Sequence, residues 1–224
     1  MEIAVIASLD LHGNVVLPGV LTPAECVGLT ALYPQTARFR SRIVMARHGF
    51  GQGEYQYFAY PLPDLLQSLR ETLYRQLAPI ANRWNTQMRI ATRYPDTLAP
   101  FLARCHAAGQ CRPTPLLLKY EAGDYNCLHQ DLYGAHVFPL QVAILLSRPH
   151  QDFTGGEFVM TEHGATATRV EVVPLQQGDA VVFAVNQRPV QGSRHMRRVA
   201  LRHGVSQLLS GQRYTAGLIF HDAV

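Results

Sequence analysis

The spacing of hydrophobic positions divides the chain into a helical first part and a strand-rich second part. Before residue 115, apolar residues recur every three or four positions in several stretches, as on one face of an α-helix. After Pro115 the pattern changes to short apolar or alternating runs between glycines and polar turns, which indicates β-strands. The expected strands cover residues 116–120, 136–146, 157–161, 168–173, 179–185, 197–203 and 214–220.

Three helices are expected in the first part. The first begins at Thr22, the N-cap of a capping box that Pro23 and Glu25 complete, and runs to about residue 33. The second begins at residue 64, and Pro79 marks a kink or a restart within it. The third runs from residue 96 to near residue 109, where a glycine ends it.

The apolar run at residues 1–11 precedes these helices. No basic residue stands before it, and it is far too short to cross a bilayer. We therefore expect an opening strand, neither a secretion signal nor a membrane segment.

Seven or eight strands without helices between them predict a β-sandwich or barrel. A chain of 224 residues fits one domain with a substantial core, and no linker-like stretch divides it. We expect a single domain over residues 1–224, of mainly β or α+β class. Residues 1–114 would supply mostly helical support and a candidate substrate lid, and residues 115–221 would form the β core.

Three side chains in the second part are candidate metal ligands. His129 and Asp131 lie two positions apart after the strand 116–120, and His203 ends the strand 197–203. Two imidazoles and one carboxylate can occupy one face of an iron octahedron, leaving three positions for other ligands. A closed tetrahedral zinc site would leave no such room. The spacing favours a mononuclear iron site at His129, Asp131 and His203.

Arg213 follows His203 by ten positions, at the start of the last expected strand. A buried guanidinium on a neighbouring strand suits the far carboxylate of a dicarboxylic cosubstrate, through two parallel charge-assisted hydrogen bonds. Tyr120 could donate a phenol hydrogen bond to the same carboxylate. Alternatively, Tyr120 is a core residue whose hydroxyl binds another partner.

Several ordered motifs resemble the double-stranded β-helix core of 2-oxoglutarate oxygenases, in the branch similar to prolyl-4-hydroxylases. They span roughly residues 115–221 and follow the family's order. In sequence order they are Lys119-Tyr120, Gly123, His129-Gln130-Asp131, residues 152–158, residues 174–183, His203-Gly204-Val205 and Gly211-Gln212-Arg213-Tyr214.

Two further resemblances concern the substrate. Leu128-His129-Gln130-Asp131 is similar to the metal motif of the alkylated-base demethylases in the same superfamily. Over its whole length, including residues 45–50 and 55–60, the chain resembles a bacterial oxygenase family whose substrates are suspected to be nucleic acids.

These resemblances imply a jelly-roll, cupin-like fold and an Fe(II)- and 2-oxoglutarate-dependent dioxygenase. Fe(II) would bind His129, Asp131 and His203, and 2-oxoglutarate would bind Arg213 and Tyr120, with dioxygen as the third reactant. The implied reaction is hydroxylation or demethylation of modified nucleic-acid bases. The alternatives are a protein (prolyl-type) or amino-acid hydroxylase, and a β-helix module that binds a partner without catalysis.

Charge and aromatic content bear weakly on the substrate. A net charge of +4 and a pI near 9.0 favour contact with polyanions. The aromatic-rich segment 47–60 is either a lid that stacks a base or an ordinary strand on the barrel. Five arginines before the distal histidine would either steer a polyanion or lie in a solvated loop: Arg188, Arg194, Arg197, Arg198 and Arg202.

The four cysteines form no framework of close pairs, so we expect a reduced compartment, the cytoplasm. Cys127 could place a thiol near the iron, although a buried inert cysteine is the stronger expectation. The spacing of Cys105, His106 and Cys111 does not support a second metal site. The pair Gly155-Gly156 is expected to form a turn rather than a phosphate-binding nest.

Overall fold

The computed structural model describes residues 3–164, 167–192 and 195–224. The helices are α1 (Ile3–His12), α2 (Pro23–Thr30), α3 (Asp64–Gln87) and α4 (Leu98–Ala107), with short 3-10 helices η1 (Thr36–Arg38) and η2 (Met45–His48). The strands of the first part are β1 (Asn14–Leu17), β2 (Phe39–Val44), β3 (Gly51–Gln52) and β4 (Glu54–Phe58). The later strands are β5 (Leu116–Glu121), β6 (Tyr125–His129), β7 (Leu140–Leu145), β8 (Phe153–Gly155), β9 (Phe158–His163), β10 (Thr168–Val173), β11 (Ala180–Ala184), β12 (Gln187–Gln191), β13 (Met196–Val205) and β14 (Leu208–Leu218).

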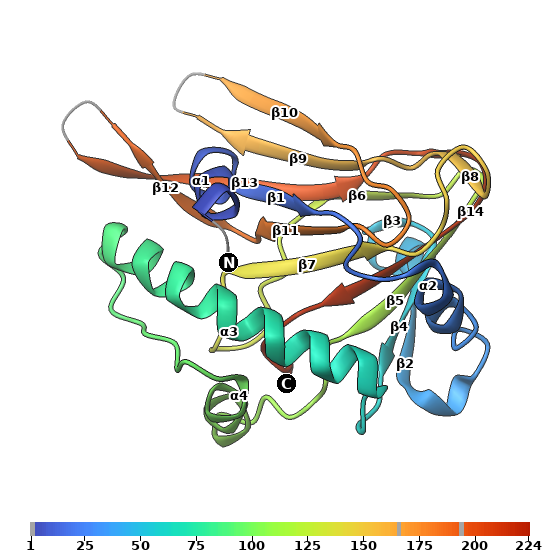
Figure 1. The fold of residues 1–224 in the computed structure, drawn as a ribbon, viewed down its shortest axis with the longest axis horizontal. Helices are drawn as coiled ribbons and strands as arrows, with labels where there is room; N and C mark the ends of the chain where they lie inside the picture. Colours follow the sequence, from blue (N-terminus) through green and yellow to red (C-terminus); the bar gives the residue numbers. More distant parts are fainter. Residues whose placement is uncertain (1–2, 165–166, 193–194) are drawn as a thin grey trace.

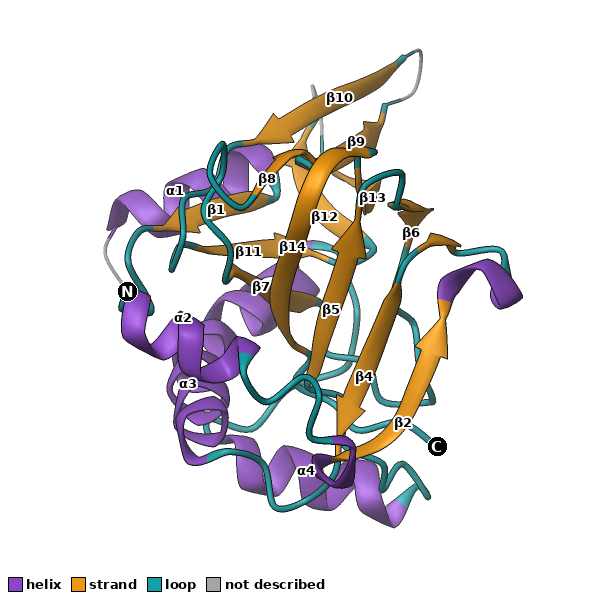
Figure 2. Ribbon diagram, turned by 90° about the vertical axis from the view of Figure 1, so that its right-hand side faces the viewer, coloured by secondary structure: helices purple, strands orange, loops and turns teal. Residues whose placement is uncertain are grey.

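Two antiparallel sheets form a double-stranded β-helix (Figures 1 and 2). The larger sheet has the order β1-β11-β7-β14-β5-β4-β2, with β8 paired to β14. The smaller sheet has the order β10-β9-β13-β6-β3, with β12 paired to β13. The jelly-roll fold predicted from the sequence is therefore confirmed.

Helix α3 runs along the larger sheet, below β7 in Figure 1, and α4 packs against α3. Helix α1 packs against β1 and β11 of the larger sheet and β12 of the smaller one. Every residue of β7 and β11 is buried, because these central strands lie between the helices and the other sheet. Helix α3 turns one apolar stripe inward, from Leu66 to Trp84. It continues through Pro79 without a restart.

A buried ion pair fixes α3 to the end of the chain. Arg70 Nη2 lies 2.8 Å from Asp222 Oδ1, and both side chains are fully buried. Tyr60 Oη and His106 Nε2 also contact this carboxylate, at 2.9 and 2.8 Å from Oδ2. Arg70 Nε donates to the carbonyl of Ile219, just after β14. The charges thus satisfy each other where α3, α4 and β14 meet.

The expectation of a strand at residues 1–11 was wrong, because residues 3–12 form helix α1; Met1 and Glu2 lie outside the described residues. A short apolar run does not by itself distinguish a buried strand from a helix. Gly13, with φ +76°, ends α1, and its N–H donates to Leu9 O at 2.8 Å. The opening strand is β1, which follows the glycine and pairs with β11.

The other three helices lie close to their expected positions. The capping box of α2 is present, with Thr22 and Glu25 in reciprocal hydrogen bonds, although α2 ends at Thr30 rather than near residue 33. The expected strands are also present, and the last one begins earlier, at Leu208. The first part is less helical than expected, because β1, β2 and β4 extend the larger sheet and β3 joins the smaller one.

No helix in the described ranges is long and apolar enough to span a membrane.

Protonation of one buried histidine should weaken the fold at acidic pH. His221 is fully buried, and its Nδ1 accepts the N–H of Phe138. Burial, aided by the charge of Arg70, lowers the pKa of His221 to about 4, below the value near 6.5 of an unfolded chain. The unfolded chain therefore binds the proton first, and stability falls as pH falls from about 6.5 toward 4, by about 3 kcal/mol at most from this group.

Urea unfolding of wild type and His221→Asn at pH 7 and pH 4 checks this expectation. The asparagine oxygen can still accept the Phe138 N–H but does not titrate. The free energy of unfolding should fall less with pH in the variant. Equal pH dependence in the two proteins would contradict the assignment.

Candidate active site

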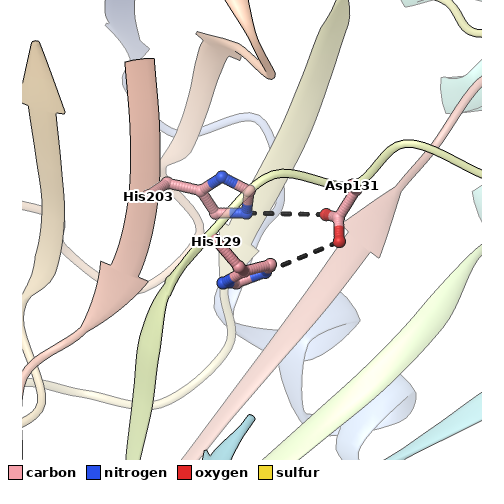
Figure 3. A group of neighbouring side chains, drawn as sticks. All are labelled: His129, Asp131 and His203. Carbon is pink, nitrogen blue, oxygen red and sulfur yellow. Dashed lines mark ion pairs between the residues drawn. The ribbon is translucent and has the colours of Figure 1, made fainter. Parts of the chain in front are cut away.

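His129, Asp131 and His203 come together at the pairing of β6 with β13 (Figure 3). His203 lies directly opposite His129 in this antiparallel register, and Asp131 is in the loop that follows β6. One ligand atom from each side chain lies within 4.8 Å of the others. His129 Nε2 is 3.5 Å from Asp131 Oδ1, and His203 Nε2 is 3.5 Å from Asp131 Oδ2. The three residues predicted from the sequence therefore form one cluster.

A β-bulge shapes this pairing. His203 is opposite His129, but Val205 is opposite Asn126, so β6 carries one residue more than β13 over this interval. Gly204 lies where the strands approach closely, and a Cβ there would be 2.6 Å from the carbonyl oxygen of Asn126. The bulge interrupts the inside-outside alternation of β6, so that Cys127 and Leu128 are both exposed.

Each imidazole presents Nε2 to the carboxylate. His129 Nδ1 is 2.7 Å from the carbonyl oxygen of Cys127, which favours a proton on Nδ1 and a free lone pair on Nε2. The His203 ring lies 4.5 Å from the ring of Phe183 and is stacked at 6.0 Å on that of Phe158, between centroids. These aromatic contacts restrict the orientation of His203.

The electrostatics of the cluster keep the carboxylate charged. Burial alone would raise the pKa of Asp131, but the hydrogen bond and charge of His203, together with the charge of His129, outweigh it and hold the pKa well below its usual value. Burial, and then the neighbouring His203, lower the pKa of His129. A deprotonated carboxylate and a neutral imidazole are the forms that bind a metal ion.

Two neighbouring side chains hold the loop that carries Asp131. Gln130 Nε2 donates to Asn186 Oδ1 at 2.9 Å and to Leu201 O at 2.7 Å, which ties the loop to β13. Tyr133 Oη donates to Asp131 Oδ1 at 2.7 Å. Burial and the negative charge of Asp131 raise the pKa of Tyr133, so the phenol keeps its proton and acts as the donor.

A cavity of about 180 Å³ opens between the two sheets beside this cluster. Along β5 and the first part of β14 the lining residues alternate, because every second side chain points into the barrel. From β14 it is lined by Arg213, Thr215 and Gly217, and from β5 by Tyr120 and Leu118. The three clustered residues lie on the smaller sheet and the loop that follows it, across the cavity from these strands.

Arg213 is a buried cation at the edge of this cavity. It is 2% exposed, and Nη1 donates to Thr215 Oγ1 at 2.7 Å. No carboxylate of the described residues lies within 4 Å of its guanidinium, and Nε has no hydrogen-bond partner there. Arg213 was expected on a strand next to those that carry the histidines. This expectation was wrong, because β14 belongs to the larger sheet and the histidines lie on the smaller one. A buried guanidinium without an acidic partner suits an anionic ligand.

Tyr120 lies beside Arg213, because the two residues are directly opposite in the β5–β14 pairing. The guanidinium carbon is 5.7 Å from the centroid of the Tyr120 ring. Burial raises the pKa of Tyr120 to about 12, and its hydroxyl accepts a hydrogen bond from Asn126 Nδ2 at 3.3 Å. The phenol therefore retains a proton that it can donate.

The glycine pair makes the expected turn, with φ of +70° at Gly155 and +64° at Gly156. Gly156 also gives the arginine room. A Cβ at this position would overlap Leu208 and lie 3.2 Å from Arg213 Cδ.

Aromatic side chains form the remaining wall of the cavity. Tyr55 and Tyr57 are in β4, which pairs with both β2 and β5, so this part of the segment 47–60 is an ordinary strand. Their rings meet edge to face at 5.3 Å, and Arg40 lies 4.3 Å over Tyr57. Phe50, which follows η2, is 45% exposed and also lines the cavity.

The arginines before His203 do not form one free basic surface. Arg188 is buried and pairs with Glu162 at 2.6 Å, and Arg198 donates to the Met88 carbonyl. Arg197 and Arg202 are exposed, while Arg194 lies outside the described residues.

The cysteines differ from expectation at one position. Cys127 was expected to be buried, but the bulge in β6 leaves it exposed, and it does not line the cavity. Cys105 is buried, His106 pairs with Asp222, and Cys111 is exposed. Among the described residues, the group His129, Asp131 and His203 is the one with metal-ligand geometry.

The donor set fits a six-coordinate metal ion better than a structural zinc ion. Two imidazole nitrogens and one carboxylate converge from one side, and the cavity lies on the other. This is the arrangement of a facial iron site with open positions. Arg213, a buried cation, lines the same cavity, so the cavity also suits an anionic ligand.

Comparison with known proteins agrees with this chemistry. Residues 53–223 match the model of the Oxygenase-NA family, described as an oxygenase catalysing oxidative methylation of damaged DNA. The chain belongs to this family. The Oxygenase-NA protein is also 48% identical over 167 residues to an uncharacterized protein found in Mycobacterium tuberculosis strains CDC 1551 and H37Rv, covering 74% of this chain and 72% of the relative.

Solved structures share the fold of the Oxygenase-NA protein. A Pseudomonas putida prolyl-4-hydroxylase aligns with a TM-score of 0.58 and 15% identity, over 99% of this chain and 98% of that one. A 2OG-Fe(II) oxygenase-family oxidoreductase from Burkholderia pseudomallei aligns with a TM-score of 0.55 and 17% identity, over 99% and 92% of the two chains. The family match confirms that the chain belongs to an oxygenase family, and the solved structures confirm the predicted jelly-roll fold.

Sequence reasoning missed Tyr133 and the structural role of Gln130. Both flank Asp131 in a loop, where no periodicity indicates the direction of a side chain. The spacing of Tyr133, two positions after Asp131, is the one signal that could have suggested it.

A divalent metal should stabilise this protein through the clustered residues. We expect anaerobic Fe(II), or Co(II) as an air-stable substitute, to raise Tm by several degrees, because about 100-fold excess over Kd contributes about 2.7 kcal/mol. Differential scanning fluorimetry measures the shift. The substitution His203→Ala should abolish the rise in Tm. The control His163→Ala should retain it, because His163 is an exposed residue on β9. An equal shift in both variants would contradict the assignment.

Proposed function

We propose that His129, Asp131 and His203 bind Fe(II), that Arg213 and Tyr120 bind the distal carboxylate of 2-oxoglutarate, and that the protein oxidises modified or alkylated nucleic-acid bases. The convergence of the three ligand atoms within 4.8 Å carries the proposal, together with the cavity that they face. This cavity is lined by a buried arginine that has no carboxylate partner among the described residues. The family description supports the choice of nucleic acid.

A metal ion held by His129, Asp131 and His203 would supply the oxidising chemistry: of the two atoms of dioxygen, one would enter a C–H bond of the substrate and the other would enter succinate as 2-oxoglutarate loses carbon dioxide. The chain's own residues provide position and exclusion of water. Arg213 orients the cosubstrate from the larger sheet, while the Cys127 carbonyl and the Phe183 ring orient His129 and His203. When the oxidised carbon is an N-methyl group, the hydroxylated product loses formaldehyde and leaves the demethylated base.

The aromatic lining of the cavity supports a planar substrate. Tyr55 and Tyr57 line the cavity together with the three proposed ligands, and Phe50 lies at an exposed position of its lining. Aromatic side chains stack on bases with a favourable free energy of roughly 1–3 kcal/mol per base. The net charge of +4 favours association with a polyanion.

Loss of the Arg213 charge should weaken cosubstrate binding selectively. In Arg213→Met the cosubstrate carboxylate loses its charge-assisted hydrogen bonds, worth roughly 1.5–3 kcal/mol. We expect KM for 2-oxoglutarate to rise about 10- to 100-fold, measured as succinate formation, while metal binding is retained. Arg148→Met, which removes an exposed arginine, is the matched control. An unchanged KM in Arg213→Met would exclude the assigned role.

The substrate class is tested by succinate formation from 2-oxoglutarate with anaerobically reconstituted Fe(II) protein. We expect single-stranded DNA that carries methylated bases to increase the rate several-fold over the same unmethylated DNA, because a bound substrate couples cosubstrate turnover to product formation. Formaldehyde should appear in step with succinate, and His129→Ala should form neither.

Succinate that requires His129 but does not respond to methylated DNA would overturn the nucleic-acid assignment and keep the oxygenase. The alternative is then a protein or amino-acid hydroxylase that uses the same residues. Mass spectrometry of a broad peptide set, with one added oxygen atom as the signal, detects that activity.

A further inference from the structure

Tyr133 makes a direct contact with one oxygen of the proposed metal carboxylate. Its hydroxyl donates to Asp131 Oδ1 at 2.7 Å. Each oxygen of this carboxylate also faces one imidazole at 3.5 Å, Oδ1 facing His129 Nε2 and Oδ2 facing His203 Nε2. The phenol hydrogen bond to Oδ1 is therefore what distinguishes the two oxygens. A carboxylate can bind a metal through one oxygen or both, and a hydrogen bond to one oxygen disfavours the second mode.

The backbone around Tyr133 is fixed by contacts that do not involve the metal cluster. Gln110 is fully buried, and its Nε2 donates to the carbonyls of Tyr133 at 3.3 Å and His136 at 3.1 Å. The N–H of His136 donates to Gln110 Oε1 at 2.7 Å. Gly134, with φ +84°, packs against Gln110, and a Cβ at this position would overlap the glutamine side chain. The loop thus presents the phenol from a fixed position.

The Tyr133 side chain also forms part of the cavity wall. Tyr133 lines the cavity beside Asp131, on the side that also holds Tyr55 and Tyr57. Its side chain therefore has two contacts that matter for function, the carboxylate on one side and the cavity on the other.

We propose that Tyr133 is a positioning residue that holds Asp131 through Oδ1 and leaves Oδ2 to bind the metal. This inference rests on the proposed function, because it takes Asp131 as a metal ligand. Binding through one oxygen keeps the coordination positions that face the cavity open for the cosubstrate and dioxygen. Removal of such a partner typically lowers metal affinity 10- to 100-fold.

The test is an anaerobic titration of apo protein with Co(II), followed by visible absorption, for wild type and Tyr133→Phe. We expect Kd for Co(II) to rise about 10- to 100-fold in the variant and the absorption bands to shift, because the carboxylate changes its binding mode. Tyr125→Phe is the matched control, since Tyr125 is exposed on β6. Its Kd and spectrum should equal those of wild type.

A second measurement separates positioning from general damage. The apo forms of Tyr133→Phe and wild type should unfold at temperatures within a few degrees of each other. With saturating Fe(II), KM for 2-oxoglutarate should stay within about twofold of wild type, because Arg213 is untouched, whereas the Fe(II) concentration for half-maximal succinate formation should rise.

The outcomes distinguish this inference from the proposed function. If wild type binds Co(II) and His203→Ala does not, but Tyr133→Phe binds as wild type does with the same spectrum, the positioning role is overturned and the metal site stands. If wild type and His203→Ala bind Co(II) equally, the metal site itself is overturned, and the role of Tyr133 with it.

Discussion

The antiparallel pairing of β6 with β13 is the constraint on which the site depends. It places His203 opposite His129, so two imidazoles from distant parts of the sequence lie side by side on neighbouring strands. The bulge next to this pair adds one residue to β6, and Gly204 allows the close approach that the bulge requires. A shift of register by one residue would turn one histidine out of the barrel. Metal-ligand geometry here is thus a consequence of strand register.

The second feature on which the site depends is a cation in the opposite wall of the cavity. Arg213 on β14 faces the same interior as the histidines but belongs to the other sheet. Its burial without an acidic partner among the described residues is unfavourable in the protein alone. The buried Arg213 and the three converging side chains indicate the same kind of ligand. An anionic cosubstrate that chelates a metal would neutralise Arg213 and also occupy the metal site.

The sequence predicted those features that follow from periodicity and order. The strands could be predicted from hydrophobic alternation and the capping box at Thr22 from its local motif. The set His129, Asp131 and His203 could be predicted from its place among the ordered motifs that resemble the oxygenase core. Helix α1 could not be predicted from the sequence, since a ten-residue apolar run fits a strand as well as a helix. The exposure of Cys127 could not either, because a bulge reverses the alternation without a sequence signal. Tyr133 depends on a loop that Gln110 fixes from a distant part of the chain.

The division of the site between two sheets has a consequence for evolution and design. The distance between the proposed metal ligands and Arg213 is set by the side chains that fill the space between the sheets, among them Phe158 and Phe183. The width of the active site is therefore a property of the hydrophobic core. A core substitution that leaves every polar residue intact can still change which substrates fit, so selectivity in this fold can be tuned from within the core.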